Sequence, residues 1–117
     1  MRSLSLLLVF LGTLSVAPVA ADARDDARKQ VEFGIEVAQR GLWREAIYRW
    51  ERATLIDPAY AAAHNNLAIA YEQEGDLDKA RAAYDKALEL EPNNVFIIQN
   101  YELFKEINDR TNPENSL

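Results

Sequence analysis

The chain has 117 residues, enough for one domain, and contains no cysteine. The lack of cysteine excludes disulfide bridges and lipid attachment through an N-terminal cysteine. Acidic residues outnumber basic ones by 19 to 13, and a formal net charge of −6 disfavours binding to a phosphate backbone or an anionic membrane surface. The composition therefore argues against nucleic acid as a partner.

Residues 1–21 have the pattern of a secretory signal peptide. Arg2 gives a basic start, an apolar stretch covers residues 4–16, and small residues follow up to Ala21. The apolar stretch is shorter than the roughly 20 residues that a membrane-spanning helix needs. We therefore expect cleavage after Ala21, with Ala23 as the alternative, and no stable membrane span afterwards. An uncleaved segment that anchors the protein in a membrane is the weaker interpretation.

From residue 27 onward the sequence repeats itself with a period of 34 residues. The units are residues 27–60 and 61–94, and residues 22–26 form a short linker before them. A repeat of this length indicates helical or mixed units that stack on one another and share a core. Among the identical pairs are Gly41 with Gly75, Ala46 with Ala80, Ala53 with Ala87, and Pro58 with Pro92.

Each unit is predicted to contain two helices joined by a turn. Gly41 and Gly75 mark the turns, because glycine reaches the left-handed backbone conformation without a Cβ penalty. Asp76 follows Gly75 and has the side chain of an N-cap residue. Pro58 and Pro92 end the second helix of each unit.

Small side chains are expected where the two helices of a unit approach each other. Trp50 and Tyr84 are large and would fill the space between neighbouring helices. The small residues occupy equivalent places in the two units: Gly34, Ala46, Ala68 and Ala80.

These residues resemble the tetratricopeptide repeat (TPR) family. The first unit departs from the family's pattern at Val37, where tyrosine is preferred, and at Gln30, where tryptophan is common; His64 takes that place in unit two. The resemblance implies an all-α fold of two TPR-like helix–turn–helix units plus a C-terminal capping helix, a fragment of an α-solenoid. The best matches lie in unit two: Asn66, Leu67, Ala68, Tyr71, Gly75, Asp76, Ala80, Tyr84, Ala87, Leu88 and Pro92.

Residues 95–108 begin a third unit and are predicted to form the capping helix. In register, Tyr101 and Phe104 face back onto unit two, whereas Glu102 and Lys105 occupy the places that would contact a partner helix. Charges at those places suit the solvated end of a repeat array. Residues 109–117 contain a proline and no periodicity, which predicts a disordered tail.

The run of residues 95–98 (Val-Phe-Ile-Ile) is more apolar than the cap of a monomer requires. One interpretation is that these side chains seal the core. The other is that they contact a second copy of the chain, so that the protein forms a homo-oligomer.

The sequence predicts a binding protein rather than an enzyme, without a metal or a cofactor. There is one histidine and no cysteine, whereas zinc sites take several such ligands. After the signal peptide Ser116 is the sole serine, so no Ser–His pair is expected in the folded part. His64 is expected to be structural. Trp43 and Trp50 are interpreted as core residues rather than as a ligand cage.

The TPR resemblance also implies a concave groove, lined by the first helix of each unit, that holds a peptide or a helical segment. A clamp for a C-terminal carboxylate is not expected, because Val31, Ile35 and Phe96 stand where it needs polar or cationic side chains. The groove residues are Arg28, Val31, Ile35 and Ala38 in unit one, Ala62, Asn65, Ile69, Glu72 and Gln73 in unit two, and Phe96, Gln99 and Leu103 in the cap.

The resulting hypothesis is an exported protein–protein interaction module, most consistent with the periplasm. The alternative is a self-associating structural scaffold of an envelope assembly, without a groove ligand. The fold family alone cannot choose between them, because it binds many unrelated partners.

Overall fold

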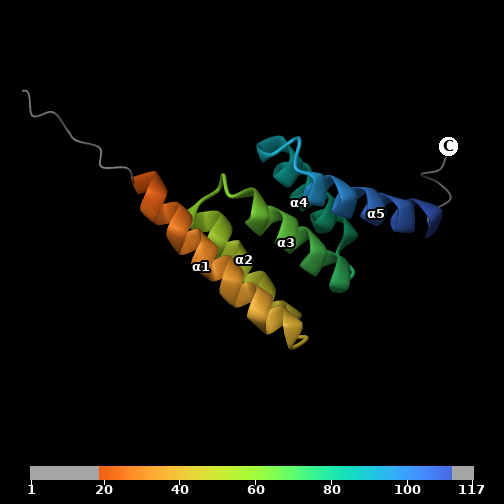
Figure 1. Ribbon diagram of the computed structural model, residues 1–117. Helices are drawn as coiled ribbons and strands as arrows, with labels where there is room; N and C mark the ends of the chain where they lie inside the picture. The colour runs from red at the N-terminus through yellow and green to blue at the C-terminus, as the bar shows by residue number, and fades with distance from the viewer. Residues whose placement is uncertain (1–18, 112–117) are drawn as a thin grey trace, which may run out of the picture.

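The computed structural model describes residues 19–111, which are almost entirely helical and contain no strand. The first two helices form one hairpin, the next two form a second, and the last helix packs on the end of the stack (Figure 1). The all-α prediction of two helix–turn–helix units and a capping helix is confirmed. The helices are α1 (Val19–Gln39), α2 (Trp43–Ile56), α3 (Ala61–Gln73), α4 (Leu77–Leu90) and α5 (Val95–Thr111).

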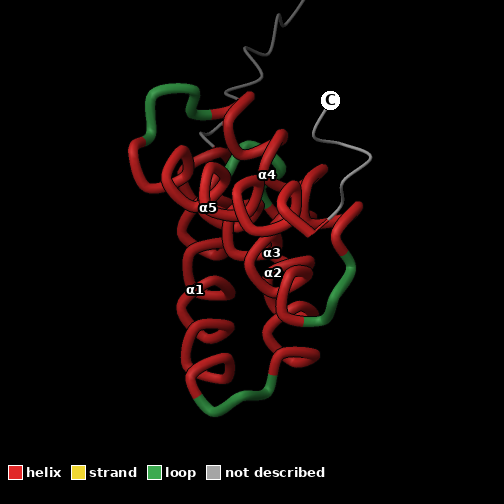
Figure 2. Tube along the Cα trace, turned by 90° about the vertical axis from the view of Figure 1, so that its right-hand side faces the viewer, coloured by secondary structure: helices red, strands yellow, loops and turns green. Residues whose placement is uncertain are grey.

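The connections between helices are short (Figure 2), and the two turns within the units have the same geometry. Gly41 and Gly75 have φ angles of 78° and 77°, as the sequence predicts. The residue after each glycine donates its N–H to a carbonyl five residues earlier, at 3.0 Å in unit one and 2.8 Å in unit two. These bonds satisfy carbonyls at the end of the first helix of each unit.

Both second helices end where the sequence predicts, and α4 has the predicted N-cap. The Asp76 carboxylate caps α4 by accepting a hydrogen bond from the backbone N–H of Lys79 at 3.3 Å. Asp57 and Glu91 follow α2 and α4 with φ angles of −137° and −135°, outside the helical range. A proline comes directly after each of them and disfavours helical geometry at the preceding residue.

Unit one is closed by the contact of Trp50 with Gly34. Trp50 is 3% exposed, and its indole N–H donates to the backbone carbonyl of Val31 at 3.0 Å. A Cβ atom added to Gly34 would lie 2.2 Å from the Trp50 Nε1 atom, so only glycine fits beneath this ring. Ala46 is fully buried and lets α2 lie close to α1.

The capping helix is attached through aromatic side chains. The rings of Tyr84 and Tyr101 stack with their centroids 5.1 Å apart, and the Phe104 ring lies 5.4 Å from that of Tyr84. Phe104 is 0% exposed and Ile97 is 2% exposed, so these side chains seal the end of the core. Tyr101 and Phe104 therefore face unit two, as their register predicts.

The capping helix is longer than the predicted 95–108, because it continues to Thr111. Asp109 pairs with Arg81 of α4 at 3.6 Å, and Arg110 pairs with Glu106 one turn earlier at 2.7 Å. These contacts stabilise the last turn. Residues 109–111 thus belong to the helix rather than to a disordered tail, and the rest of that tail lies outside the described residues.

The predicted linker 22–26 lies inside α1, which begins at Val19. Arg24 forms an ion pair with Asp57, and its guanidinium carbon lies 4.9 Å from the centre of the Tyr60 ring. The pairing lowers the pKa of Asp57. Of the predicted signal peptide, all but the last three residues lie outside the described part of the chain.

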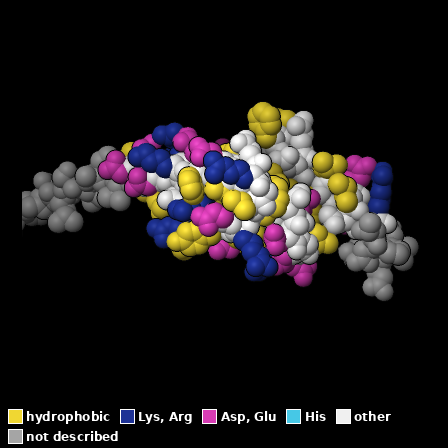
Figure 3. Space-filling model, turned by 90° about the horizontal axis from the view of Figure 1, so that it is seen from below, with side chains coloured by type: hydrophobic (Ala, Val, Ile, Leu, Met, Phe, Trp, Pro, Cys, Tyr) yellow, Lys and Arg dark blue, Asp and Glu magenta, His cyan; other side chains and the backbone are white. Residues whose placement is uncertain are grey.

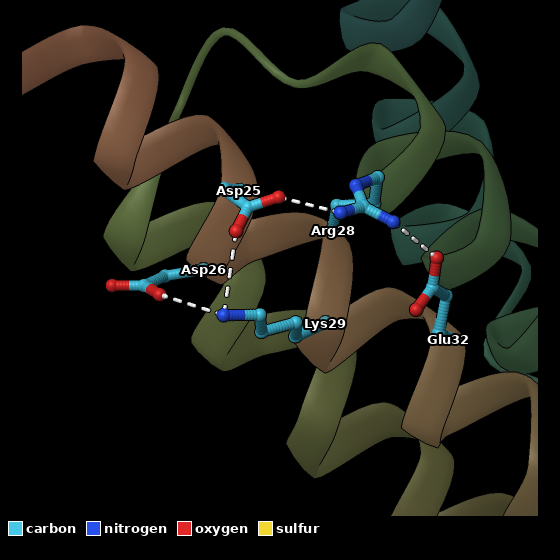
Figure 4. A network of polar contacts seen from close by, with 5 residues as sticks. All are labelled: Asp25, Asp26, Arg28, Lys29 and Glu32. Carbon is cyan, nitrogen blue, oxygen red and sulfur yellow. Dashed lines mark hydrogen bonds and ion pairs between the residues drawn. The ribbon is translucent and has the colours of Figure 1, made fainter.

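An ion-pair network covers the exposed side of this part of α1 (Figure 4). Arg28 bridges Asp25 and Glu32 at 2.5 and 2.7 Å, and Lys29 lies 3.3 Å from Asp25 and 3.9 Å from Asp26. The hydrogen bond from Arg28 lowers the pKa of Asp25. Such i,i+3 and i,i+4 pairs give this exposed part of the helix a small, salt-sensitive stabilisation.

Basic and acidic side chains are interspersed on the face shown in Figure 3, with hydrophobic side chains between them. Among the helices in residues 19–111, none is both long and apolar enough to span a bilayer.

Candidate functional site

One apolar residue recurs at the same place in the first helix of every unit. Ile35, Ile69 and Leu103 are spaced by 34 residues on α1, α3 and α5. Ile35 is 40% exposed and Leu103 is 56% exposed, and Ile69 is partly exposed between them. We call these three equivalent positions, each with an apolar side chain that is at least partly exposed, the groove row.

Most of the other predicted groove residues also reach the surface. Phe96 is 77% exposed, and Asn65 accepts a hydrogen bond from the Asn100 side chain of α5 at 3.3 Å. Val31 is the exception: it is 4% exposed and belongs to the core, so it does not line the groove. The remaining predicted positions are exposed or partly exposed: Arg28, Ala38, Ala62, Glu72, Gln73 and Gln99.

Beside the groove row lies a hollow of about 330 Å³, bounded by three helices. Trp50 is buried, as predicted for a core residue, and it also forms part of the wall of the hollow. Trp43 is partly exposed and lines the hollow, so it is not a core residue alone. The lining is Ile35, Ala38 and Gln39 of α1, Trp43 and Trp50 of α2, and Asn66 and Ile69 of α3.

Four residues that line the hollow are missing from the sequence-based groove: Gln39, Trp43, Trp50 and Asn66. Gln39 could have been found, because it precedes the predicted Gln73 by 34 residues. Trp43 is the first residue of α2, and the family-based groove uses only the first helix of each unit. Its contribution therefore depends on how α2 is packed beneath α1 and α3.

The hollow contains no charged side chain, and its lining includes the side-chain amides of Gln39 and Asn66. Within residues 19–111 no hydrogen bond reaches the side chains of Gln39 or Asn66. Each amide has both a donor and an acceptor, so these groups can bind the backbone of a peptide. The hollow is thus suited to an uncharged side chain with amide groups beside it.

Two tyrosine hydroxyls stabilise the helices beneath the groove. Tyr71 of α3 donates to Glu51 of α2 at 2.9 Å, and Tyr84 of α4 donates to Glu72 of α3 at 2.6 Å. Burial, together with the bond to Glu51, raises the pKa of Tyr71 to about 12. The same kinds of cause raise the pKa of Tyr84.

The raised pKa of Tyr71 predicts a loss of stability in alkali. The folded state favours the neutral phenol of Tyr71. Its contribution to the free energy of unfolding is therefore complete below the ordinary pKa of 10.0 and is lost as the pH rises through about 12. We expect the free energy of unfolding to decline more steeply over this range in the unmodified protein than in a Tyr71→Phe variant. Urea titrations across the range measure both slopes, and equal slopes would contradict the assignment.

No group of three metal-ligating side chains occurs within the described residues. The His64 ring nitrogen Nε2 lies 2.9 Å from the Pro58 carbonyl oxygen, where it fastens the start of α3 to the preceding turn. This contact fits the structural role predicted for His64.

Family models built from known proteins match the repeated part of the chain. The family model described as Tetratricopeptide repeat matches residues 61–94, and one described as TPR repeat matches residues 36–75. Together the two matches cover residues 36–94, half of the 117-residue chain.

Three curated relatives are similar to parts of the chain. Type IV pilus assembly protein PilF of Pseudomonas aeruginosa is 34% identical over 86 residues, which are 72% of this chain and 34% of PilF. The chloroplastic tetratricopeptide repeat domain-containing protein PYG7 of Arabidopsis thaliana is 32% identical over 73 residues, 62% of this chain and 24% of PYG7.

The uncharacterized protein ycf37 of Pyropia yezoensis is 51% identical over 45 residues, 38% of this chain and 25% of that protein. The chain thus spans between a quarter and a third of the length of these relatives. With its repeats, turns and helical hairpins, the chain belongs to the tetratricopeptide repeat family.

Proposed function

We propose that this protein is an exported interaction module that binds a peptide or helical segment of a partner protein in its concave groove. The proposal is supported by the groove row: Ile35 and Ile69 line one hollow, and Leu103 is the equivalent exposed residue of α5. An amphipathic helix or an extended segment buries its apolar side chains against such a surface. The amides of Gln39, Gln73 and Gln99 beside the row supply hydrogen bonds.

The N-terminal sequence supports export, and the periplasm is the compartment we propose. The similarity to a protein named for type IV pilus assembly favours an accessory role in an envelope assembly. The groove is two and a half units long, so the bound segment is short.

Substitution of both Ile35 and Ile69 with aspartate tests the groove. Partner binding would leave these carboxylates desolvated without a partner charge, so we expect binding to weaken by about tenfold or more. Neither residue is fully buried, and helicity should be retained. The measurement is affinity capture from an envelope fraction of the source organism with the mature chain as bait, followed by quantitative mass spectrometry.

Leu55→Asp is the matched control, because Leu55 is 82% exposed on α2 and lies outside the groove. Circular dichroism of all variants confirms that the fold is intact. If the double variant captures the same proteins in the same amounts as the control, the groove does not bind them.

Self-association is the second candidate function, and it has its own observation. In the apolar run 95–98, Ile97 alone seals the core, whereas Val95 is 59%, Phe96 is 77% and Ile98 is 37% exposed. A scaffold built through this surface would lose its oligomer on Phe96→Ser but keep it on substitution of Ile35 and Ile69. Sedimentation that shows monomer alone at tens of micromolar removes this candidate.

A further inference from the structure

One difference between the two units on the groove side concerns Ala38 and Glu72. In unit two, Glu72 accepts a hydrogen bond from the hydroxyl of Tyr84 at 2.6 Å. The residue 34 positions before Glu72 is Ala38, which has no side chain of that length. Trp50 stands where unit two has Tyr84, and its indole N–H turns to the Val31 carbonyl instead. The space next to Ala38 is the hollow of about 330 Å³ described above.

The lining of the hollow restricts what can occupy it. Its volume lies at the lower end of the roughly 300–1,000 Å³ typical of ligand pockets, so it has room for one large side chain. Ile35, Trp43 and Ile69 make it mostly apolar, and no charge lies in its wall to pair with a charged occupant. A charged group would lose its hydration there without compensation, which favours leucine, methionine or phenylalanine.

Beyond the hollow the surface becomes acidic. Trp43 also lines an adjoining depression of about 480 Å³, which includes Arg44, Glu45 and Glu74. Glu45 is already paired with Arg49 at 3.0 Å. Glu74 has no ion-pair or hydrogen-bond partner for its carboxylate in the part of the chain that the structure describes.

The turn that follows Glu74 adds further negative charge. A third depression, of about 450 Å³, contains Glu74, Asp76 and Asp78. Of these three carboxylates, Asp76 has Lys79 at 3.8 Å. These three carboxylates outnumber the two nearby cations, Lys79 and Arg44, so the turn attracts a basic side chain more than an acidic one.

We propose that the hollow holds one uncharged, bulky apolar side chain of the partner segment, and that a neighbouring lysine or arginine of this segment lies against the Glu74 turn. The inference rests on the groove function proposed above and specifies the chemistry of the partner. The apolar anchor and the basic side chain can bind next to each other, because Trp43 lines both the hollow and the depression that contains Glu74.

The two tryptophans of the chain make this occupancy directly observable. In a ¹⁵N-labelled protein, the indole N–H groups of Trp43 and Trp50 give one NMR signal each. The probe is the capped peptide acetyl-Gly-Ser-Phe-Lys-Ser-Gly-amide. We expect a saturable shift of the Trp43 signal. The peptide with serine in place of phenylalanine should give no shift, and the peptide with glutamate in place of lysine should bind several-fold more weakly.

Ala38→Leu fills the hollow from its wall, and because Ala38 is partly exposed the helix can accept the larger side chain. We expect the affinity for the phenylalanine–lysine peptide to fall by about tenfold or more. Ala82→Leu, on the exposed side of α4, is the matched control and should bind as the unmodified protein does. Equal affinities of these two variants would overturn the inference, as would equal binding of the lysine and glutamate peptides.

Partner capture separates this inference from the groove proposal. Capture that survives Ala38→Leu but is lost on substitution of Ile35 and Ile69 with aspartate leaves the groove in place and rejects the hollow. Capture that survives both changes rejects the groove itself.

Discussion

Replacement of Phe104 with alanine is expected to lower the free energy of unfolding by about 3–5 kcal/mol. The Phe104 side chain is 0% exposed and contacts the rings of Tyr84 and Tyr101, with centroids 5.4 and 6.2 Å away. The guanidinium carbon of Arg81, on α4, lies 5.3 Å from the centre of the Phe104 ring. Removing the ring leaves a cavity where α5 joins α4. Small domains are stable by about 5–15 kcal/mol in total, so this change removes much of the margin.

Leu103→Ala is the control for this prediction. Leu103 is the neighbour of Phe104 on the same helix but is 56% exposed, and surface substitutions usually change stability by less than about 0.5 kcal/mol. Urea denaturation followed by circular dichroism compares the two variants. Losses of the same size would show that Phe104 does not fasten the capping helix.

Gly34→Ala is expected to lower the free energy of unfolding although alanine is the better helix former. Alanine in place of glycine gains about 1 kcal/mol in an exposed helix. Here the new Cβ would lie 2.2 Å from Nε1 and 2.7 Å from Cδ1 of Trp50. The ring is 3% exposed and hydrogen-bonded to Val31, so it cannot move away freely. Overpacking costs about 1–3 kcal/mol or more, and at such short distances we expect a net loss of about 2 kcal/mol.

Two comparisons identify the cause of this loss. Gly41→Ala introduces a Cβ with no atom within 4 Å. Any decrease that it causes in the free energy of unfolding therefore comes from the φ angle of +78° alone. Combining Gly34→Ala with Trp50→Leu removes the clash, so the effects of the two changes should not add. Strict additivity in urea denaturation would contradict the contact between Gly34 and Trp50.

The repeated part of the fold could be predicted because its signals are local. The glycines at 41 and 75 are the described glycines with a positive φ angle, and the prolines at 58 and 92 follow the ends of α2 and α4. A glycine or proline acts through its own backbone geometry, so its place in the sequence is enough to predict a turn. The 34-residue spacing then gave the order of the helices.

The outer ends of α1 and α5 could not be predicted in the same way. Arg24 is paired with Asp57, and Asp109 is paired with Arg81. Each pair joins residues that are far apart in the sequence, and a search for periodicity within a window does not detect it. The linker at 22–26 and the start of the tail at 109 were therefore placed outside helices that in fact include them.

The sequence predicts which groove residues occupy equivalent positions, but it does not predict the hollow beside them. Register alone placed Ile35, Ile69 and Leu103 in equivalent positions. It also placed Val31 in the groove, whereas this side chain is 4% exposed and belongs to the same buried cluster as Trp50. The hollow depends on the orientation of the same ring and on the small size of Ala38, neither of which the family's pattern specifies.

The difference between Ala38 and Glu72 also affects how a bound segment is aligned. An array of identical units offers a ligand equivalent positions displaced by one unit, between which the ligand can slide. Here Glu72 and its hydrogen bond to Tyr84 take up in unit two the place that stays open beside Ala38 in unit one. A segment with a single large side chain therefore meets different surfaces in the two units, and this difference favours one offset along the solenoid.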